Sequence, residues 1–149
     1  MNGNMESMLC LSIRQPWAYM ILNCGKDVEN RTWSTKVRGR VLIHASKGMT
    51  ADEWSDAWWF ALGIESDTGI KGSGMTVTNY QDVKRGGIVG SVEIVDCVTR
   101  SDSPWFGGPY GFVLRDPQPL PFMPCRGALG FFRYNAGIEF PERSGGKLQ

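Results

Sequence analysis

Short apolar runs separated by turn-forming residues recur along this chain. Residues 9–13 (LCLSI) and 40–45 (RVLIHA) have the length and composition of buried strands. Apolar residues alternate onto both faces of residues 88–98, as in the wall of a barrel. Two further strand-length runs cover residues 110–114 and 129–134. The pattern therefore predicts a sheet of about five or six strands.

Two segments have helical spacing instead. Residues 16–23 open with a proline, which suits the first helical turn, and Gly25 can cap the end. Residues 50–62 open with Thr50 and Glu53, the two partners of a capping box. We therefore predict two short helices, the second ending near Gly63.

The connections decide the fold class. Residues 65–87 are rich in Gly, Ser, Thr and Asp, so residues 66–80 are expected to be the most mobile internal segment. A proline-rich connection is predicted over residues 117–124, and residues 135–149 read as a flexible C-terminal tail. No helix separates the late strands, which argues against a doubly wound parallel sheet. We expect an α+β domain, a small barrel with its helices outside.

Charge is balanced overall and uneven locally. The 149 residues carry a net charge of +1, which is not the basic excess of a dedicated duplex-binding protein. Residues 26–47 hold six basic and two acidic side chains, whereas residues 50–68 hold five acidic side chains and no basic one. These segments either steer an anionic ligand to one place or form two solvated faces of opposite sign.

The cysteines and the N-terminus bear on metal binding and cellular compartment. Four cysteines are widely spaced without a CxxC pair, and the chain has one histidine, so we expect no metal and no cofactor. Apolar neighbours around the cysteines suggest reduced, buried thiols. The first eight residues are polar, unlike a signal peptide, and no apolar stretch has membrane-spanning length. We expect a cytoplasmic protein that does not enter a membrane, of unknown oligomeric state.

A compact group of charges follows the first predicted helix. Glu29 and Arg31 project to the same side of an extended segment, and Lys26 lies at the preceding turn. Arg and Lys can donate to a phosphate or a base edge, and Glu can accept from an amino group. The group is therefore either a ligand site or an exposed structural salt bridge.

Polar and aromatic residues elsewhere are candidates for the walls of a cleft. His44 ends an apolar strand ahead of Ser46, so it is either a satisfied core residue or the border of a cleft. Gln15 begins the first helix, and Trp33 and Trp105 are candidates for exposed rings that stack on a base. The predicted ligand-binding set is Gln15, Lys26, Glu29, Arg31, Trp33, His44, Ser46 and Trp105.

The segment Gly25-Lys26-Asp27-Val28-Glu29-Asn30-Arg31 resembles the signature of the ASCH family. The family spacing places its glycine two residues before the lysine, whereas Gly25 directly precedes Lys26 here. Surrounding segments also resemble the family's strands, and the likeness covers roughly residues 8–134, read as one ASCH-like domain. Those segments are residues 11–17, 38–46, 108–112 and 127–130.

The resemblance implies a PUA-like β-barrel of about five to six strands flanked by two or more helices, with a cleft between barrel and first helix. Such folds are associated with RNA and modified nucleobases. The leading interpretation is an RNA- or nucleotide-binding domain whose cleft takes a single-stranded segment or one splayed or modified base.

Two alternatives stay open. One is a nucleic-acid-processing hydrolase, cleaving RNA or acting as a nucleoside amidohydrolase, with Lys26 and Glu29 as catalytic residues. In the amidohydrolase pattern a threonine lies three residues after the lysine, where this chain has Glu29, and Thr32 points away from the charged group. The other is a protein-interaction module built on an exposed patch at Trp58 and Trp59.

Overall fold

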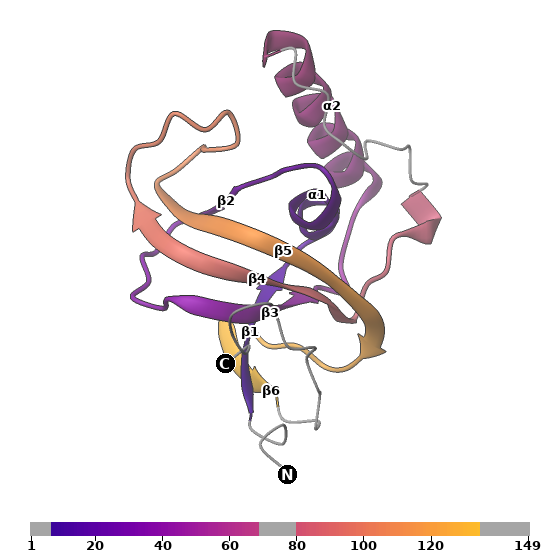
Figure 1. The fold of residues 1–149 in the computed structure, drawn as a ribbon. Coiled ribbons are helices and arrows are strands. Elements are labelled where there is room, and N and C mark those ends of the chain that lie inside the picture. The colour runs from indigo at the N-terminus through magenta and orange to yellow at the C-terminus, as the bar shows by residue number, and fades with distance from the viewer. Residues whose placement is uncertain (1–6, 69–79, 135–149) are drawn as a thin grey trace.

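A computed structural model describes residues 7–68 and 80–134 of the chain (Figure 1). Of the connection expected to be mobile, residues 66–68 belong to the second helix and residues 69–79 lie outside the described residues, as does the tail 135–149. The elements in chain order are β1 (Met8–Ile13), α1 (Trp17–Asn23), β2 (Val28–Arg31), β3 (Gly39–Ala45), α2 (Ala51–Thr68), the 3₁₀ helix η2 (Tyr80–Asp82), β4 (Gly87–Val98), β5 (Tyr110–Pro124) and β6 (Phe131–Tyr134).

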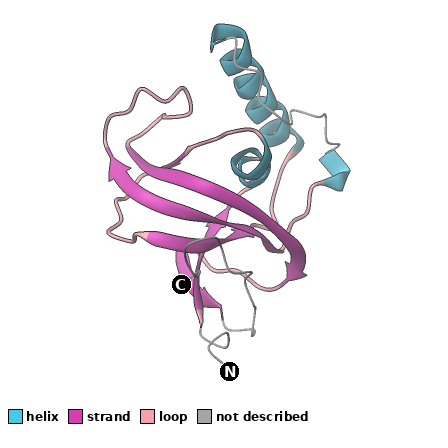
Figure 2. Ribbon diagram, in the orientation of Figure 1, coloured by secondary structure: helices cyan, strands magenta, loops and turns pink. Residues whose placement is uncertain are grey.

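The six strands form one mixed sheet, in the order β2-β5-β4-β3-β1-β6. β1 and β3 run parallel, and the other neighbouring pairs are antiparallel. Sheet and helices together confirm the predicted α+β class, and Figure 2 shows both helices to one side of the long β4–β5 ribbon.

The described sheet does not close into a barrel, because β2 and β6 stand at opposite ends of its order. Aromatic rings link the two ends in place of backbone hydrogen bonds. The Trp33 ring lies edge-on to Phe112 of β5 at 5.3 Å and to Phe131 of β6 at 5.8 Å, between ring centroids. The closed barrel is therefore not confirmed.

The prediction of a connection over residues 117–124 is wrong, because these residues continue β5. Beyond Leu114, β4 is the only described strand that pairs with β5, so one side of β5 needs no backbone N–H donors. Prolines are tolerated in such edge positions. Pro117, Pro119 and Pro121 are all exposed and alternate with half-buried residues, which is the period of a strand.

The predicted capping box starts α2. The Thr50 N–H donates to Glu53 Oε1 at 2.8 Å, and the Glu53 N–H donates to Thr50 Oγ1 at 3.1 Å. The helix runs on past Gly63, its predicted stop, because one helical glycine costs only about 1 kcal/mol. The turn that follows places Ile64 against the buried cluster between the helices, which offsets that cost.

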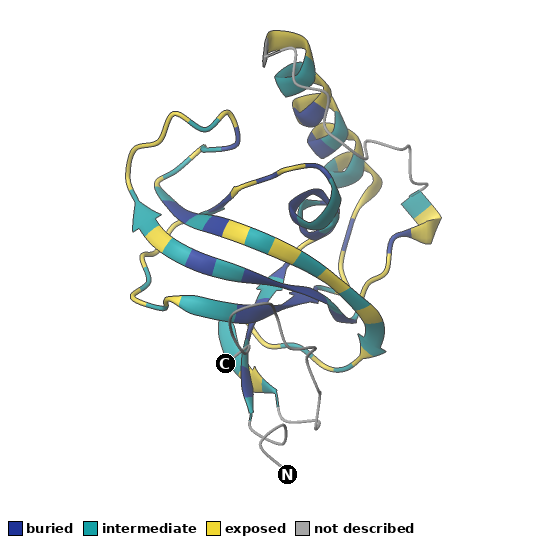
Figure 3. Cartoon of the chain, viewed as in Figure 1, coloured by how far each residue is buried: buried dark blue, intermediate teal, exposed yellow. Residues whose placement is uncertain are grey.

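α1 connects two parts of the core. Its residues Ala18 and Ile21 pack into the main cluster of β1, β3, β4 and β5, whereas Met20 packs with Ala57 and Ala61 of α2. In Figure 3 the buried residues form a continuous run on β3 and alternate with half-buried residues on β1 and α1. α1 is therefore packed on two sides, against the sheet and against α2. The turn that follows it begins from a well-packed helix.

Candidate functional site

Lys26, Glu29 and Arg31 meet as the sequence predicts. Gly25 ends α1 with a φ of 75°, which turns the chain toward β2. Lys26 Nζ lies 3.0 Å from Glu29 Oε1, and Arg31 Nη2 lies 3.0 Å from Glu29 Oε2. Arg31 Nε also donates to Glu29 Oε2 at 3.2 Å, so one carboxylate joins two cations. We call this group the Lys26–Glu29–Arg31 network.

The network is buried and not an exposed salt bridge. Lys26 is 4% exposed and Glu29 is 8% exposed. Lys26 Nζ also donates to the Val28 carbonyl and lies 5.5 Å from the centre of the Trp17 ring. Each charge has partners inside the protein, which is the condition for burying charged groups.

Arg31 connects the network to β1, which is not adjacent to β2 in the sheet. Its Nη2 donates to the backbone carbonyl of Ser12 at 2.7 Å. Ser12 Oγ in turn donates to the carbonyl of Ala128 at 2.6 Å, and the Ser12 N–H donates to the carbonyl of Gly130 at 3.1 Å. The network therefore supports the loop between β5 and β6, residues 125–130.

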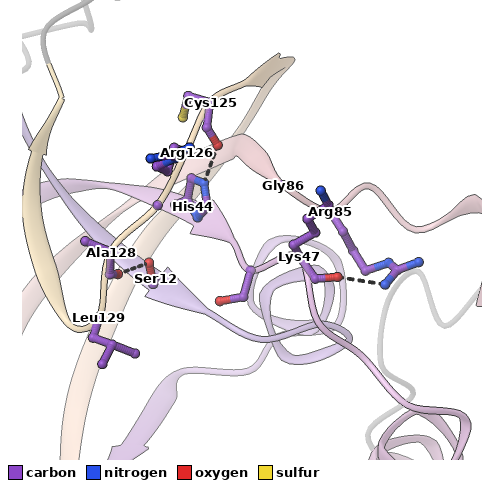
Figure 4. A pocket seen from close by; sticks show the side chains of 11 residues that line it. Ser12, His44, Lys47, Arg85, Gly86, Cys125, Arg126, Ala128 and Leu129 are labelled. Carbon is purple, nitrogen blue, oxygen red and sulfur yellow. Dashed lines mark hydrogen bonds between the residues drawn. The ribbon is translucent and has the colours of Figure 1, made fainter.

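That loop forms one wall of a pocket of about 650 Å³ (Figure 4). Two of the predicted site residues, His44 and Ser46, line the pocket, whereas the other six do not. The lining residues come from the ends of several strands: Ser12, His44, Ser46, Lys47, Arg85, Gly86, Cys125, Arg126, Gly127, Ala128 and Leu129.

Strand register brings three cations to this pocket. Gly87 of β4 pairs with Ala45 of β3 on one side and with Pro124 of β5 on the other, so the three residues form one row across the sheet. Lys47 lies two residues after Ala45, Arg126 lies two after Pro124, and Arg85 lies two before Gly87. Because β4 runs antiparallel to both neighbours, all three offsets lead to the same edge of the sheet.

Among the described residues, the pocket cations have no acidic counterpart. The lining includes neither Asp nor Glu, and within the described part of the chain Lys47, Arg85 and Arg126 form no salt bridge. Arg85 Nη1 donates to the Lys47 carbonyl at 2.7 Å, which holds two of the cationic segments together. The site therefore presents uncompensated positive charge to a ligand.

Sequence reasoning missed the roles of Lys47, Arg85 and Arg126. The local signal was a basic residue close to a glycine at a strand end, as in residues 84–87 (KRGG) and 125–127 (CRG). The second of these segments does not stand at a strand end in the sequence prediction, which places a connection and not a strand over residues 117–124.

His44 forms part of the pocket wall, and only one of its two ring nitrogens has a hydrogen-bond partner among the described residues. A carbonyl oxygen accepts only, so the 2.8 Å contact with the Cys125 carbonyl assigns a hydrogen to His44 Nε2. Nδ1 is buried and has no hydrogen-bond partner among the described residues. A Cβ built on Gly127 would lie 2.4 Å from His44 Cε1 and 2.6 Å from Nδ1, so only glycine fits there.

The remaining predicted residues lie outside the pocket. Gln15 is buried, where its Nε2 donates to the Lys84 carbonyl and its Oε1 accepts from the Tyr19 N–H. Trp33 is 37% exposed and lies beside Gly130, the residue that follows Leu129 of the pocket.

The prediction of an exposed ring at Trp105 is wrong, since this side chain is 7% exposed. It packs against Phe60 at 5.9 Å between ring centroids, in the cluster between α1 and α2. Of the two residues of the alternative interaction patch, Trp58 packs against Tyr19 and Trp54, whereas Trp59 is 73% exposed.

Burial raises the pKa values of three cysteine thiols. Burial raises the pKa of Cys10 to about 12 and that of Cys24 to about 11, from an ordinary value of 9.0. Burial also raises the pKa of Cys125 at the pocket wall. The described residues include no group of three or more His, Cys, Asp or Glu side chains able to hold a metal ion.

Comparison with known proteins identifies the family of this chain. The ASCH domain matches residues 11–108, which is more than half of the chain. The chain belongs to the ASCH domain family. Its matched region includes the Lys26–Glu29–Arg31 network and two of the three pocket cations, whereas Arg126 lies beyond the match.

Two curated relatives of this ASCH chain bear the same name, Activating signal cointegrator 1. The human protein is 28% identical over 119 residues, and the mouse protein is 28% identical over 121 residues. Each alignment covers 74% of this chain but 19% of the relative, so the chain spans about a fifth of the length of these proteins. In the described part of the chain, no helix is both long and apolar enough to cross a membrane.

Proposed function

We propose that this ASCH domain binds single-stranded RNA or a nucleotide in the pocket at the shared edge of β3, β4 and β5. The observation that carries the proposal is that Lys47, Arg85 and Arg126 line one pocket whose described lining includes no acidic residue. Charge-assisted hydrogen bonds from such cations are the usual means of holding a phosphate. The pocket volume of about 650 Å³ lies in the range of small-ligand sites.

The rim of the pocket suits the apolar face of a base. Leu129 is 98% exposed although it is apolar and lines the pocket. The Trp33 ring lies against the neighbouring Gly130, which puts a partly exposed aromatic face close to this rim. Stacking of a base on such side chains is tolerant of sequence and typical of single-strand binding.

In this proposal the Lys26–Glu29–Arg31 network acts as a positioning group. Arg31 is joined through Ser12 to the loop that carries Arg126, so the network sets the shape of the wall. Direct contact of a ligand with Lys26, Glu29, Arg31, Gln15 or Trp105 stays a prediction, as does catalysis by Lys26 and Glu29. Hydrolysis there would require a substrate to displace the partners that now surround Lys26 Nζ.

Fluorescence anisotropy with short labelled single-stranded RNA tests the proposal. We expect Arg126→Gln to weaken binding by about tenfold, the loss of one charge-assisted hydrogen bond. Arg100→Gln is the matched control, because Arg100 is exposed and lies outside the pocket. Equal affinities of the two variants would contradict binding at this site. RNA or acetylated nucleoside turnover that is lost in Lys26→Met would favour the hydrolase instead.

A further inference from the structure

We propose that the pocket recognises a phosphate monoester, the terminal phosphate of a strand or of a mononucleotide, in preference to an internal phosphodiester. This inference rests on the proposed function and names the chemical group that the pocket selects. It follows from the three cations that line one pocket and from the lack of an acidic residue in its described lining.

The three backbone segments that carry the cations lie side by side and do not follow one strand. Lys47, Arg85 and Arg126 extend from three adjacent strands at equal offsets from one row of paired residues. Neighbouring strands are about 4.8 Å apart, so their backbones at this edge lie within roughly 10 Å. A groove that follows a strand distributes its cations along several successive phosphates, one negative charge at a time.

Backbone hydrogen bonds continue beyond the row of Ala45, Gly87 and Pro124 and hold the three segments together. The Gly86 N–H donates to the Ala45 carbonyl at 2.8 Å, and the Cys125 N–H donates to the Gly86 carbonyl at 3.2 Å. The three cationic segments are therefore hydrogen-bonded to each other where they enter the pocket. Arg85 and Lys47 are joined once more through the Lys47 carbonyl.

A phosphate monoester matches this charge better than a diester does. A monoester carries about −1.5 to −2 at neutral pH and presents three terminal oxygens, whereas a diester carries −1 and presents two. Lys47, Arg85 and Arg126 are exposed, and their long side chains can each donate to a different oxygen of the monoester. Ser46 supplies a further hydroxyl at the pocket wall.

The wall that carries Arg126 favours entry by a strand end. Residues 125–130 are held across the pocket by hydrogen bonds from His44 Nε2 to the Cys125 carbonyl and from Ser12 Oγ to the Ala128 carbonyl. Gly127 packs against the His44 ring within this stretch. A chain that continued in both directions past the cations would have to cross this wall.

Binding of matched RNA hexamers to the full chain tests the inference. Three hexamers share one sequence and bear a 5′-phosphate, a 3′-phosphate or no terminal phosphate. We expect a terminal phosphate at one end to tighten binding by about tenfold or more. Binding of adenosine 5′-monophosphate is then compared with binding of adenosine and of the phosphorylated hexamer. A strand-end site binds the hexamer more tightly than the mononucleotide, which distinguishes it from a mononucleotide site.

Variants of the pocket cations test whether the terminal phosphate binds in the pocket. Arg85→Gln and Arg126→Gln should each remove most of the preference for the phosphorylated hexamer, whereas Arg100→Gln should keep it. Equal binding of phosphorylated and unphosphorylated hexamers, with both weakened by Arg126→Gln, would overturn the monoester inference and leave the proposed function standing. No binding of any hexamer or nucleotide would overturn both. Thermal melts of each variant confirm that the compared proteins are folded.

Discussion

The guanidinium of Arg31 donates a hydrogen bond of 2.7 Å to the backbone carbonyl of Ser12. This contact joins β2, at one end of the sheet order, to β1, which lies next to the other end. It also connects the buried network to the pocket, because Ser12 holds the loop of residues 125–130. The motif that resembles the family signature thus supports the pocket wall formed by residues 125–130.

Loss of Arg31 should therefore affect folding first. We expect Arg31→Ala to lower the free energy of unfolding by about 3 kcal/mol, because it removes one partner of a buried charged group. Urea unfolding measures the change. Arg38→Ala is the control, since the Arg38–Asp96 pair at 3.7 Å is largely exposed and should contribute no more than about 1 kcal/mol. Unchanged stability with weakened RNA binding would instead make Arg31 a direct ligand contact.

Gly127 should not tolerate a side chain. We expect Gly127→Ala to destabilise the fold by about 1 to 3 kcal/mol, because its Cβ would overlap the buried His44 ring. The double variant with His44→Ala should recover part of the loss, as chemical denaturation would show. Gly63→Ala has open space around its Cβ within α2, so it should stabilise by about 0.5 to 1 kcal/mol. A neutral Gly127→Ala would mean that the loop moves away from His44 at little cost.

The start of α2 should weaken in acid. The side-chain hydrogen bond from Arg14, followed by that from the Thr50 N–H, lowers the pKa of Glu53 to about 2, from an ordinary 4.5. A lowered folded-state pKa gives stability that is present above about pH 4.5 and lost as the pH falls toward 2. The stability difference between the wild type and Glu53→Gln should therefore shrink over this range in urea unfolding.

Asp56→Asn, at an exposed α2 position outside the capping box, supplies the comparison for the Glu53 experiment. Its stability difference from the wild type should change little between about pH 5 and pH 2. A Glu53→Gln difference that stays constant with pH would show that Arg14 does not bind the carboxylate in solution.

Thiol labelling should follow burial. Because burial raises the pKa of Cys10 to about 12 and of Cys24 to about 11, we expect both to resist iodoacetamide at pH 8 in the native protein. Half-buried Cys97 should react first, as peptide mass spectrometry would record. Urea should make all four cysteines reactive. Labelling of native Cys10 as fast as Cys97 would contradict the buried position in β1.

The same raised pKa values predict a loss of stability in alkali. A thiol whose folded-state pKa lies above its unfolded value stabilises the fold fully below about pH 9, and this contribution falls as the pH rises toward 11 to 12. The melting temperature should decline over that interval.

The sequence by itself determined the features that depend on neighbouring residues. The Thr50–Glu53 capping box and the left-handed Gly25 both involve positions within one helical turn, so they could be predicted without knowledge of the fold. The proximity of Lys26, Glu29 and Arg31 was predictable for the same reason, because a turn and a strand of known period separate them by five residues at most.

Only the tertiary structure determined which residues form the pocket and which aromatic rings are buried. Lys47, Arg85 and Arg126 come from segments far apart in the chain, and they meet because the pairing register aligns Ala45, Gly87 and Pro124. Burial of Trp105 likewise depends on α2 packing against α1, which no local pattern near Trp105 records. Register and packing arise from the simultaneous fit of all strands and helices, so the ends of three strands became one cationic site only on folding.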